Sequence, residues 1–297
     1  MMQWRLRTAA MFAAMTGLLV VIGMLVGYLF HNVWLGLVIM LAVSVLFNVY
    51  SYYCSKSMAL RANKVRIVTR DEAPRLYDIV ENLANKAGLP MPEVGISSMP
   101  MPNAFATGRN PKNAAVVATE QILNLLNDDE LEGVMAHELS HVKNRDILVM
   151  SVASTMASLV AYVTRMAVWA SMFSSNDENN GAGFAIALLA DILLPIAAML
   201  VQLGVSRNRE YLADESGARL TGRPMALANA LLKLEGGCSA RTNNYDNPSC
   251  ANMWISNPFG KKKCSGLVNL FRTHPSTEDR VERLRKLDQE LNKLPWE

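Results

Sequence analysis

The sequence predicts a mainly helical membrane protein with four transmembrane helices and a polar part that carries a small β-sheet. Hydrophobic residues make up 51% of the 297 residues and charged residues 19%, a more apolar balance than a soluble domain of this length needs. The apolar residues gather in four long runs, arranged as two pairs with a short polar break inside each pair. The remaining stretches show helical periodicity or short strand-like runs bounded by Pro and Gly.

The first pair of apolar runs covers residues 11–30 and 33–53. Neither run carries a charged residue, and each reaches the roughly 20 residues that a helix needs to cross about 30 Å of hydrocarbon. Arg5 and Arg7 precede the first run, as in a signal peptide. Because the run is too long for a signal peptide and no clear cleavage site follows it, we expect an uncleaved anchor.

The second pair covers residues 147–173 and 184–205. The first of these runs is interrupted only by Arg165 and the second only by Asp191. In an antiparallel hairpin the two side chains lie at similar depth. Since an unpaired charge in hydrocarbon is costly, we expect them to form an ion pair. The alternative is that each side chain reaches the far interface separately.

Lysine and arginine residues flank the four runs on one side only. The flanking positions are Arg5, Arg7, Lys56, Arg61, Lys64, Arg66, Lys143, Arg145, Arg207 and Arg209. The two connecting turns carry no basic residue apart from a histidine, so the positive-inside rule places the flanks and the polar bulk in the cytoplasm. The predicted division is an N-terminal transmembrane hairpin over 1–55, a first cytoplasmic part over 56–146, a second hairpin over 147–205 and a second cytoplasmic part over 206–297.

Local patterns place helices and strands in the cytoplasmic parts. Helical patterns cover 71–88, the stretch from Glu120 through His141, and 276–294, whereas strand patterns cover 92–98, 103–108 and 113–119. We expect Asn127 or Asp128 to cap the helix that holds His141. The strand at 113–119 is our candidate for an exposed edge that a substrate backbone could join. Residues 236–266 fit no regular pattern and indicate a long irregular excursion.

Charge and cysteine usage exclude several function classes. The net charge is only +3, and no stripe of basic and aromatic residues accompanies it, so nucleic acid is not an expected partner. None of the four cysteines has C-x-x-C spacing, which argues against a zinc knuckle and against a redox dithiol. We expect the cysteines to be reduced.

Two of the four histidines stand close together in the chain. His137 and His141 flank Glu138 in the pattern H-E-x-x-H. On a helix this spacing places both imidazoles on one face, where they can bind a single zinc ion. Glu138 can then reach a water on that metal as a general base. The alternative is a solvated helix with two incidental histidines.

A catalytic zinc site needs a third protein ligand and an open position. His141 shortly precedes the second pair of apolar runs, and Glu210 shortly follows it. Because an antiparallel hairpin returns its outer ends to the same side, we expect Glu210 to lie beside the histidines as the third ligand. Asp214, one helical turn later, could accept the free N–H of a zinc-bound imidazole. The alternative for both acids is an ordinary exposed helix face.

Four stretches carry a resemblance to a known family: "MPNAFATG", "VMAHELSHVKNRD", "SRNREYLADESGARL" and "FRTHPSTEDRVERL". In this order they resemble the HtpX-type membrane zinc metalloproteases, in the larger group that includes the CAAX prenyl proteases. The resemblance implies a zincin-like cytoplasmic domain of the gluzincin type. It implies one zinc ion per subunit, with the ligands His137, His141 and Glu210, and with Glu138 as base and acid.

The resemblance also implies that His274 and Asn103 line the active site. From the residues alone, the alternative for His274 is a capping or packing residue before Pro275, and the alternative for Asn103 is a turn-former. The implied function is endoproteolysis of membrane or misfolded proteins, in quality control and stress response. The implied location is the bacterial inner membrane, with a multi-pass chain in the lipid bilayer and a cytoplasmic active site. A prenyl-protein protease and a zinc-stabilised, non-catalytic membrane adaptor are the alternatives, and no oligomeric state is predicted.

Overall fold

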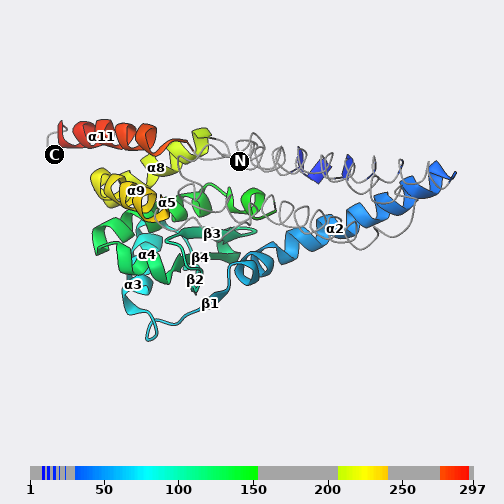
Figure 1. Ribbon diagram of the computed structural model, residues 1–297, viewed down its shortest axis with the longest axis horizontal. Helices are drawn as coiled ribbons and strands as arrows, with labels where there is room; N and C mark the ends of the chain where they lie inside the picture. Colours follow the sequence, from blue (N-terminus) through cyan, green and yellow to red (C-terminus); the bar gives the residue numbers. More distant parts are fainter. Residues whose placement is uncertain are drawn as a thin grey trace, which may run out of the picture.

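The structure, a computed structural model, describes scattered positions between residues 9 and 24 and the ranges 31–152, 207–239 and 275–293. Within them the chain is mainly helical, with one mixed four-stranded sheet (Figure 1). This agrees with the mainly helical fold and small sheet that the sequence predicts. Most of the runs at 11–30 and 147–205 lies outside the described residues, as do Arg165 and Asp191, so four spans and an intramembrane ion pair stay predictions.

Helix α2 (Val33–Ala62) is, in the part of the chain that the structure describes, the one helix long and apolar enough to cross a membrane. Asn32 begins it by accepting a hydrogen bond from the Leu35 N–H. Its 30 residues span about 45 Å at 1.5 Å per residue. Large apolar side chains such as Trp34 and Leu46 are exposed along it. It extends away from the sheet (Figure 1).

The last turns of α2 pack onto the polar part. The helix runs past residue 55, where the sequence analysis placed a boundary. There Ala59 joins a buried cluster with Met101, Phe105 and Val117. Helix α2, which we expect to enter the membrane, therefore also packs against the sheet with its last turns.

The sheet has the order β1-β2-β4-β3. Its strands are β1 (Val65–Ile67), β2 (Glu93–Ser97), β3 (Ala104–Gly108) and β4 (Ala114–Thr119). Strand β4 pairs parallel with β2 and antiparallel with β3, while β1 pairs antiparallel with β2. The three predicted strands are confirmed, and β1 was not predicted. The proposal of an exposed edge at 113–119 is wrong, because β4 is hydrogen-bonded on both sides and the edge strands are β1 and β3.

In the described ranges, six further helices surround the sheet or pack on one another. They are α3 (Pro74–Ala87), α4 (Glu120–Leu125), α5 (Asp128–Lys143), α8 (Arg207–Thr221), α9 (Pro224–Ser239) and α11 (Thr277–Lys293). The acids that were expected to open the helix at 71 lie before it, and Pro74 occupies its first turn instead, where a missing N–H costs nothing. Gly88 ends α3 as expected, with φ 68°. Helix α9 takes in residues 236–239, which were expected to be irregular.

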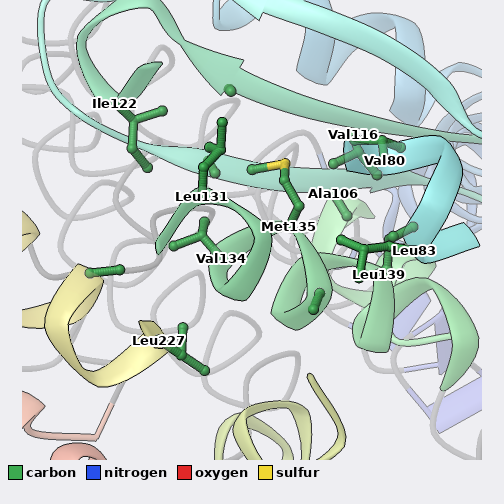
Figure 2. Packing of buried hydrophobic residues seen from close by; sticks show 14 of the residues in the cluster. Val80, Leu83, Ala106, Val116, Ile122, Leu131, Val134, Met135, Leu139 and Leu227 are labelled. Atoms are coloured by element: carbon green, nitrogen blue, oxygen red, sulfur yellow. The ribbon is translucent and has the colours of Figure 1, made fainter. Parts of the chain in front are cut away.

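Helix α5 lies at the centre of the core. It contacts the sheet and α3 on one side and α8 and α9 on the other (Figure 1). The side chains that Figure 2 labels come from α5, the sheet, α3, α4 and α9: Leu131, Val134, Met135, Leu139, Ala106, Val116, Val80, Leu83, Ile122 and Leu227. Burying a side chain of this size stabilises the fold by about 1.5–3 kcal/mol, so α5 is held firmly from both sides.

Candidate metal centre

The start of α5 is fixed by a reciprocal cap. The Asn127 side chain accepts a hydrogen bond from the Glu130 N–H, and the Glu130 carboxylate accepts one from the Asn127 N–H. Three acids in the first turn complement the positive end of the helix dipole. Asn127 is thus the N-cap, one of the two candidates named from the sequence. With both its start and its apolar face fixed, α5 holds the H-E-x-x-H residues rigidly.

His137 and His141 face each other on α5, one turn apart. Their Nε2 atoms are 3.2 Å apart and their rings are nearly perpendicular, with 87° between the planes. Glu210, near the start of α8, approaches from the opposite side. Its Oε2 lies 3.7 Å from the His137 Nε2, and its Oε1 lies 3.5 Å from the His141 Nε2. All three side chains are buried.

These distances match the spacing of donor atoms around a tetrahedral zinc ion. Two donors bound at about 2.05 Å with a tetrahedral angle lie roughly 3.3 Å apart. The nitrogen–nitrogen distance of 3.2 Å and the two nitrogen–oxygen distances of 3.5 and 3.7 Å fall close to that value. Two imidazoles and a carboxylate are also the ligand types of a catalytic zinc with one open position. The three residues present therefore fit the metal.

A buried ion pair lies behind His137. Asp214 Oδ1 is 2.9 Å from the His137 Nδ1. Arg280 of α11 donates two hydrogen bonds to the same carboxylate, Nε to Oδ2 at 2.8 Å and NH2 to Oδ1 at 2.6 Å. Burial favours the neutral acid, but Arg280 and His137 hold the pKa of Asp214 below its usual range. The carboxylate stays ionised and faces the nitrogen of His137 that points away from Glu210.

Glu138 lies next to the cluster in a dry environment. Burial raises the pKa of its carboxyl to about 8, with Glu210 adding to the rise and His141 opposing it. A backbone hydrogen bond from Ala106 in the edge strand β3 also opposes the rise. A divalent cation beside Glu138 would oppose it further. A carboxyl group whose pKa is moved toward neutrality can both accept and return a proton.

The surroundings shift the pKa values of the two histidines in opposite directions. Burial lowers the pKa of His137 below its ordinary value. Burial opposes the charged form of His141 too, but the carboxylates of Asp146, Glu210 and Glu138 outweigh it and raise the pKa of His141 to about 9. A cluster this rich in negative charge favours a cation at its centre.

The structure brings most of the residues named from the sequence to one place. His137, Glu138, His141, Glu210 and Asp214 form the cluster described above. Asn103 is buried in the segment before β3, where its backbone N–H donates to Thr119 Oγ1 and its carbonyl accepts from the Thr119 N–H, both at 2.9 Å. His274 lies outside the described residues.

Three charged residues at the cluster were not identified from the sequence. Arg280 lies inside a stretch that carries the resemblance, but the sequence analysis assigns it no role. Arg209 is one of the basic flanks of the membrane runs, and Asp146 has no predicted role. In the structure Arg209 donates a 2.8 Å hydrogen bond to Asp146, which lies 3.5 Å from the His141 Nδ1. Their positions in the sequence could have indicated a role at the cluster. Arg209 adjoins Glu210, and Asp146 shortly follows His141.

Comparison with known proteins agrees with this geometry. A family model described as Peptidase family M48 matches residues 70–288. The proteins called Protease HtpX homolog from Pyrococcus furiosus and Thermococcus kodakarensis are each 47% identical, over 96% of this chain and over 96% and 97% of their own lengths. The protein of the same description from Persephonella marina is 41% identical over 97% of this chain and 99% of its own.

Among solved structures, the crystal structure of S. mikatae Ste24p matches 94% of this chain at 18% identity, with a TM-score of 0.46. The chain spans 65% of that protein's length. A likeness this distant carries no argument here. The family model and the full-length relatives do, and they show that the chain belongs to peptidase family M48, among its HtpX-type metalloproteases.

Proposed function

We propose that the chain is an integral membrane zinc endopeptidase that cleaves membrane or misfolded proteins at the cytoplasmic face of the membrane. The observation that carries the proposal is the convergence of His137, His141 and Glu210 at the spacing of zinc ligands, with Glu138 beside them. Membership of a metalloprotease family gives that cluster a reaction to perform.

The proposed ligands are the Nε2 atoms of His137 and His141 and the carboxylate of Glu210. Asp214 accepts the N–H of the His137 ring and so leaves the Nε2 lone pair free for the metal. When bound, a zinc ion supplies a Lewis acid that polarises a carbonyl and lowers the pKa of a coordinated water toward about 7. One ion per subunit is the proposed stoichiometry.

Proton transfer is the proposed role of Glu138. Its carboxylate takes the proton from the water that attacks the peptide carbonyl and then passes it to the leaving nitrogen. Burial raises the pKa of Glu138 to about 8, and a bound cation would lower it again. A pKa between the ordinary value and this raised one would suit a group that must be a base in the first step and an acid in the second. His274 is proposed to donate a hydrogen bond to the developing oxyanion, and Asn103 to contact the substrate.

The location in a membrane is supported by α2. Only 6% of its most apolar stretch is buried inside the protein, and its exposed large side chains include Trp34 at 77% and Leu46 at 70%. An exposed apolar surface that runs along most of a helix indicates contact with an apolar environment. A lipid bilayer is the proposed environment, with the cluster on the cytoplasmic side and with substrates drawn from the same membrane during quality control.

The test uses detergent-purified full-length protein. Metal content is measured, and cleavage of casein, of an unfolded membrane protein and of a farnesylated C-terminal peptide is followed with and without a chelator. We expect close to one zinc per chain, cleavage of the first two substrates, and loss of cleavage on chelation that added zinc reverses. Zinc-loaded protein that cleaves none of the three substrates contradicts the proposal. Preference for the farnesylated peptide points to a prenyl-protein protease instead.

The proposed topology has its own test. Lys143 and Arg207 lie in exposed positions at the two ends of the segment that contains the expected second hairpin. Single cysteines at these positions, in cells that express the full chain, should both react with a reagent only after the cytoplasmic side is opened. Labelling from opposite sides of the membrane contradicts the hairpin.

A further inference from the structure

The C-terminal end of α5 turns back on itself directly beside His141. The Asp146 N–H donates to the His141 carbonyl at 3.0 Å, and the Arg145 N–H donates to the Val142 carbonyl at 3.1 Å. This pair of bonds is the pattern of a Schellman cap. The cap needs a left-handed residue, and Arg145 takes that conformation with φ 60° although it is not a glycine. The turn brings Asp146 back over the last turn of the helix.

The returned Asp146 side chain faces the far nitrogen of His141. Its Oδ2 is 3.5 Å from the His141 Nδ1, and its Oδ1 accepts a 2.8 Å hydrogen bond from the Arg209 Nη1. The Arg209 and Asp146 side chains are only 10% and 9% exposed. A buried ion pair of this kind keeps a carboxylate in one place, because moving it would break a hydrogen bond between two buried charges.

A similar but closer arrangement occurs at the other histidine, where the distance from the carboxylate to Nδ1 is 2.9 Å. There Asp214 faces the His137 Nδ1, and Arg280 holds the carboxylate with two hydrogen bonds. Each imidazole of the cluster therefore has an aspartate beside its Nδ1. Arg209 of α8 binds the aspartate beside His141, and Arg280 of α11 binds the one beside His137. A carboxylate facing Nδ1 keeps the proton on that nitrogen and leaves Nε2 free as a ligand atom.

We propose that Asp146 is a positioning residue for His141, and that Arg209 acts through Asp146. The inference rests on the proposed function, in which His141 binds zinc. Asp146 fixes the tautomer and orientation of the imidazole. The ion pair also ties the end of α5 to the start of α8, so the same contact sets the approach of Glu210, which adjoins Arg209. The ion pair of Asp146 and Arg209 thus fixes the relative positions of two of the three proposed ligands.

Zinc affinity of the full-length protein in detergent, measured by competition with a chromophoric chelator, tests the inference. Loss of such a supporting carboxylate weakens metal binding roughly 10–100-fold. We therefore expect a loss in that range for Asp146→Asn, and also an altered absorption spectrum when cobalt replaces zinc. Arg209→Met should also weaken binding, and the double variant should bind no more weakly than Asp146→Asn alone. Arg209→Lys, which keeps the charge, should restore most of the affinity and carries the test if Asp146→Asn does not fold.

A matched control is another ion pair that involves the same helix. Glu130 and Lys233 form an ion pair between α5 and α9 at 2.8 Å, away from the histidines. Lys233→Met, which removes this ion pair without altering the cap formed by Asn127 and Glu130, should lower stability without changing zinc affinity or the cobalt spectrum. The variant His141→Ala distinguishes a failure of this inference from a failure of the proposed function. If His141→Ala loses zinc while Asp146→Asn keeps wild-type affinity and spectrum, the inference is overturned and the proposed function stands. If His141→Ala keeps zinc, the proposed function fails.

Discussion

Gly217 of α8 lies directly against the backbone of His137 in α5. A Cβ at Gly217 would lie 2.8 Å from the His137 nitrogen and 3.0 Å from the Ala136 carbonyl carbon. The nearest atoms at this point are thus backbone atoms of α5. Because Gly217 lies on the helix that carries Glu210 and Asp214, the absence of its Cβ allows both carboxylates to reach the histidines.

Gly217→Ala should therefore weaken the metal site. The added methyl meets backbone atoms that cannot turn aside, so α8 must shift away from α5 and carry Glu210 with it. Overpacking of this kind costs about 1–3 kcal/mol. We expect a lower thermal unfolding midpoint and weaker zinc binding in the same variant. At Gly236 in α9, apart from its chain neighbours and its own helix backbone, no atom of the described residues lies within 4 Å of the place that a Cβ would take. Gly236→Ala should therefore leave zinc binding unchanged.

Arg280→Met should be strongly destabilising. It leaves the buried Asp214 carboxylate without its main partner, and removing one member of a buried ion pair costs about 3–5 kcal/mol. Adding Asp214→Asn to Arg280→Met should recover part of that stability, because the unpaired charge is gone. Thermal or denaturant unfolding in detergent measures both. Arg219 and Glu215 pair on the exposed face of α8, and Arg219→Met should change stability by less than about 0.5 kcal/mol.

Glu138→Gln should separate metal binding from catalysis. The amide keeps the shape of the side chain but cannot take a proton from water, and the three proposed ligands are untouched. Zinc content should stay at the wild-type level while casein cleavage falls by at least the roughly 10²–10⁴-fold that general acid–base catalysis contributes. Glu120→Gln, at an exposed position on α4, should retain full cleavage. Wild-type cleavage by Glu138→Gln would remove this residue from the mechanism.

The parts of the cluster that the sequence predicted are those with a local or topological signature. His137 and His141 share a helical face by their spacing alone. Glu210 follows from the rule that a hairpin brings its two ends together. The N-cap follows from an asparagine and an aspartate just before an acidic first turn, which made Asn127 and Asp128 the two candidates. Each of these needs only a short stretch of chain or one connection.

The parts that were missed depend on partners distant in the sequence. Arg209 stands next to an apolar run and has the pattern of a membrane flank, and only the fold brings Asp146 to it. Arg280 is one of several charges in an amphipathic helix, and the sequence does not distinguish the buried charge from the exposed ones. The inner position of β4 did have a signal, because a run of uninterrupted apolar residues is typical of a strand buried on both faces.

Zinc stoichiometry of Glu210→Ala tests the central claim most directly, since everything proposed for the cluster requires this carboxylate as the third ligand. Glu215→Ala is the matched control, because Glu215 is on the same helix and about half exposed. The account predicts that Glu210→Ala retains little zinc after dialysis, while Glu215→Ala and Glu138→Gln each retain about one ion per chain. Undiminished zinc in Glu210→Ala would contradict it.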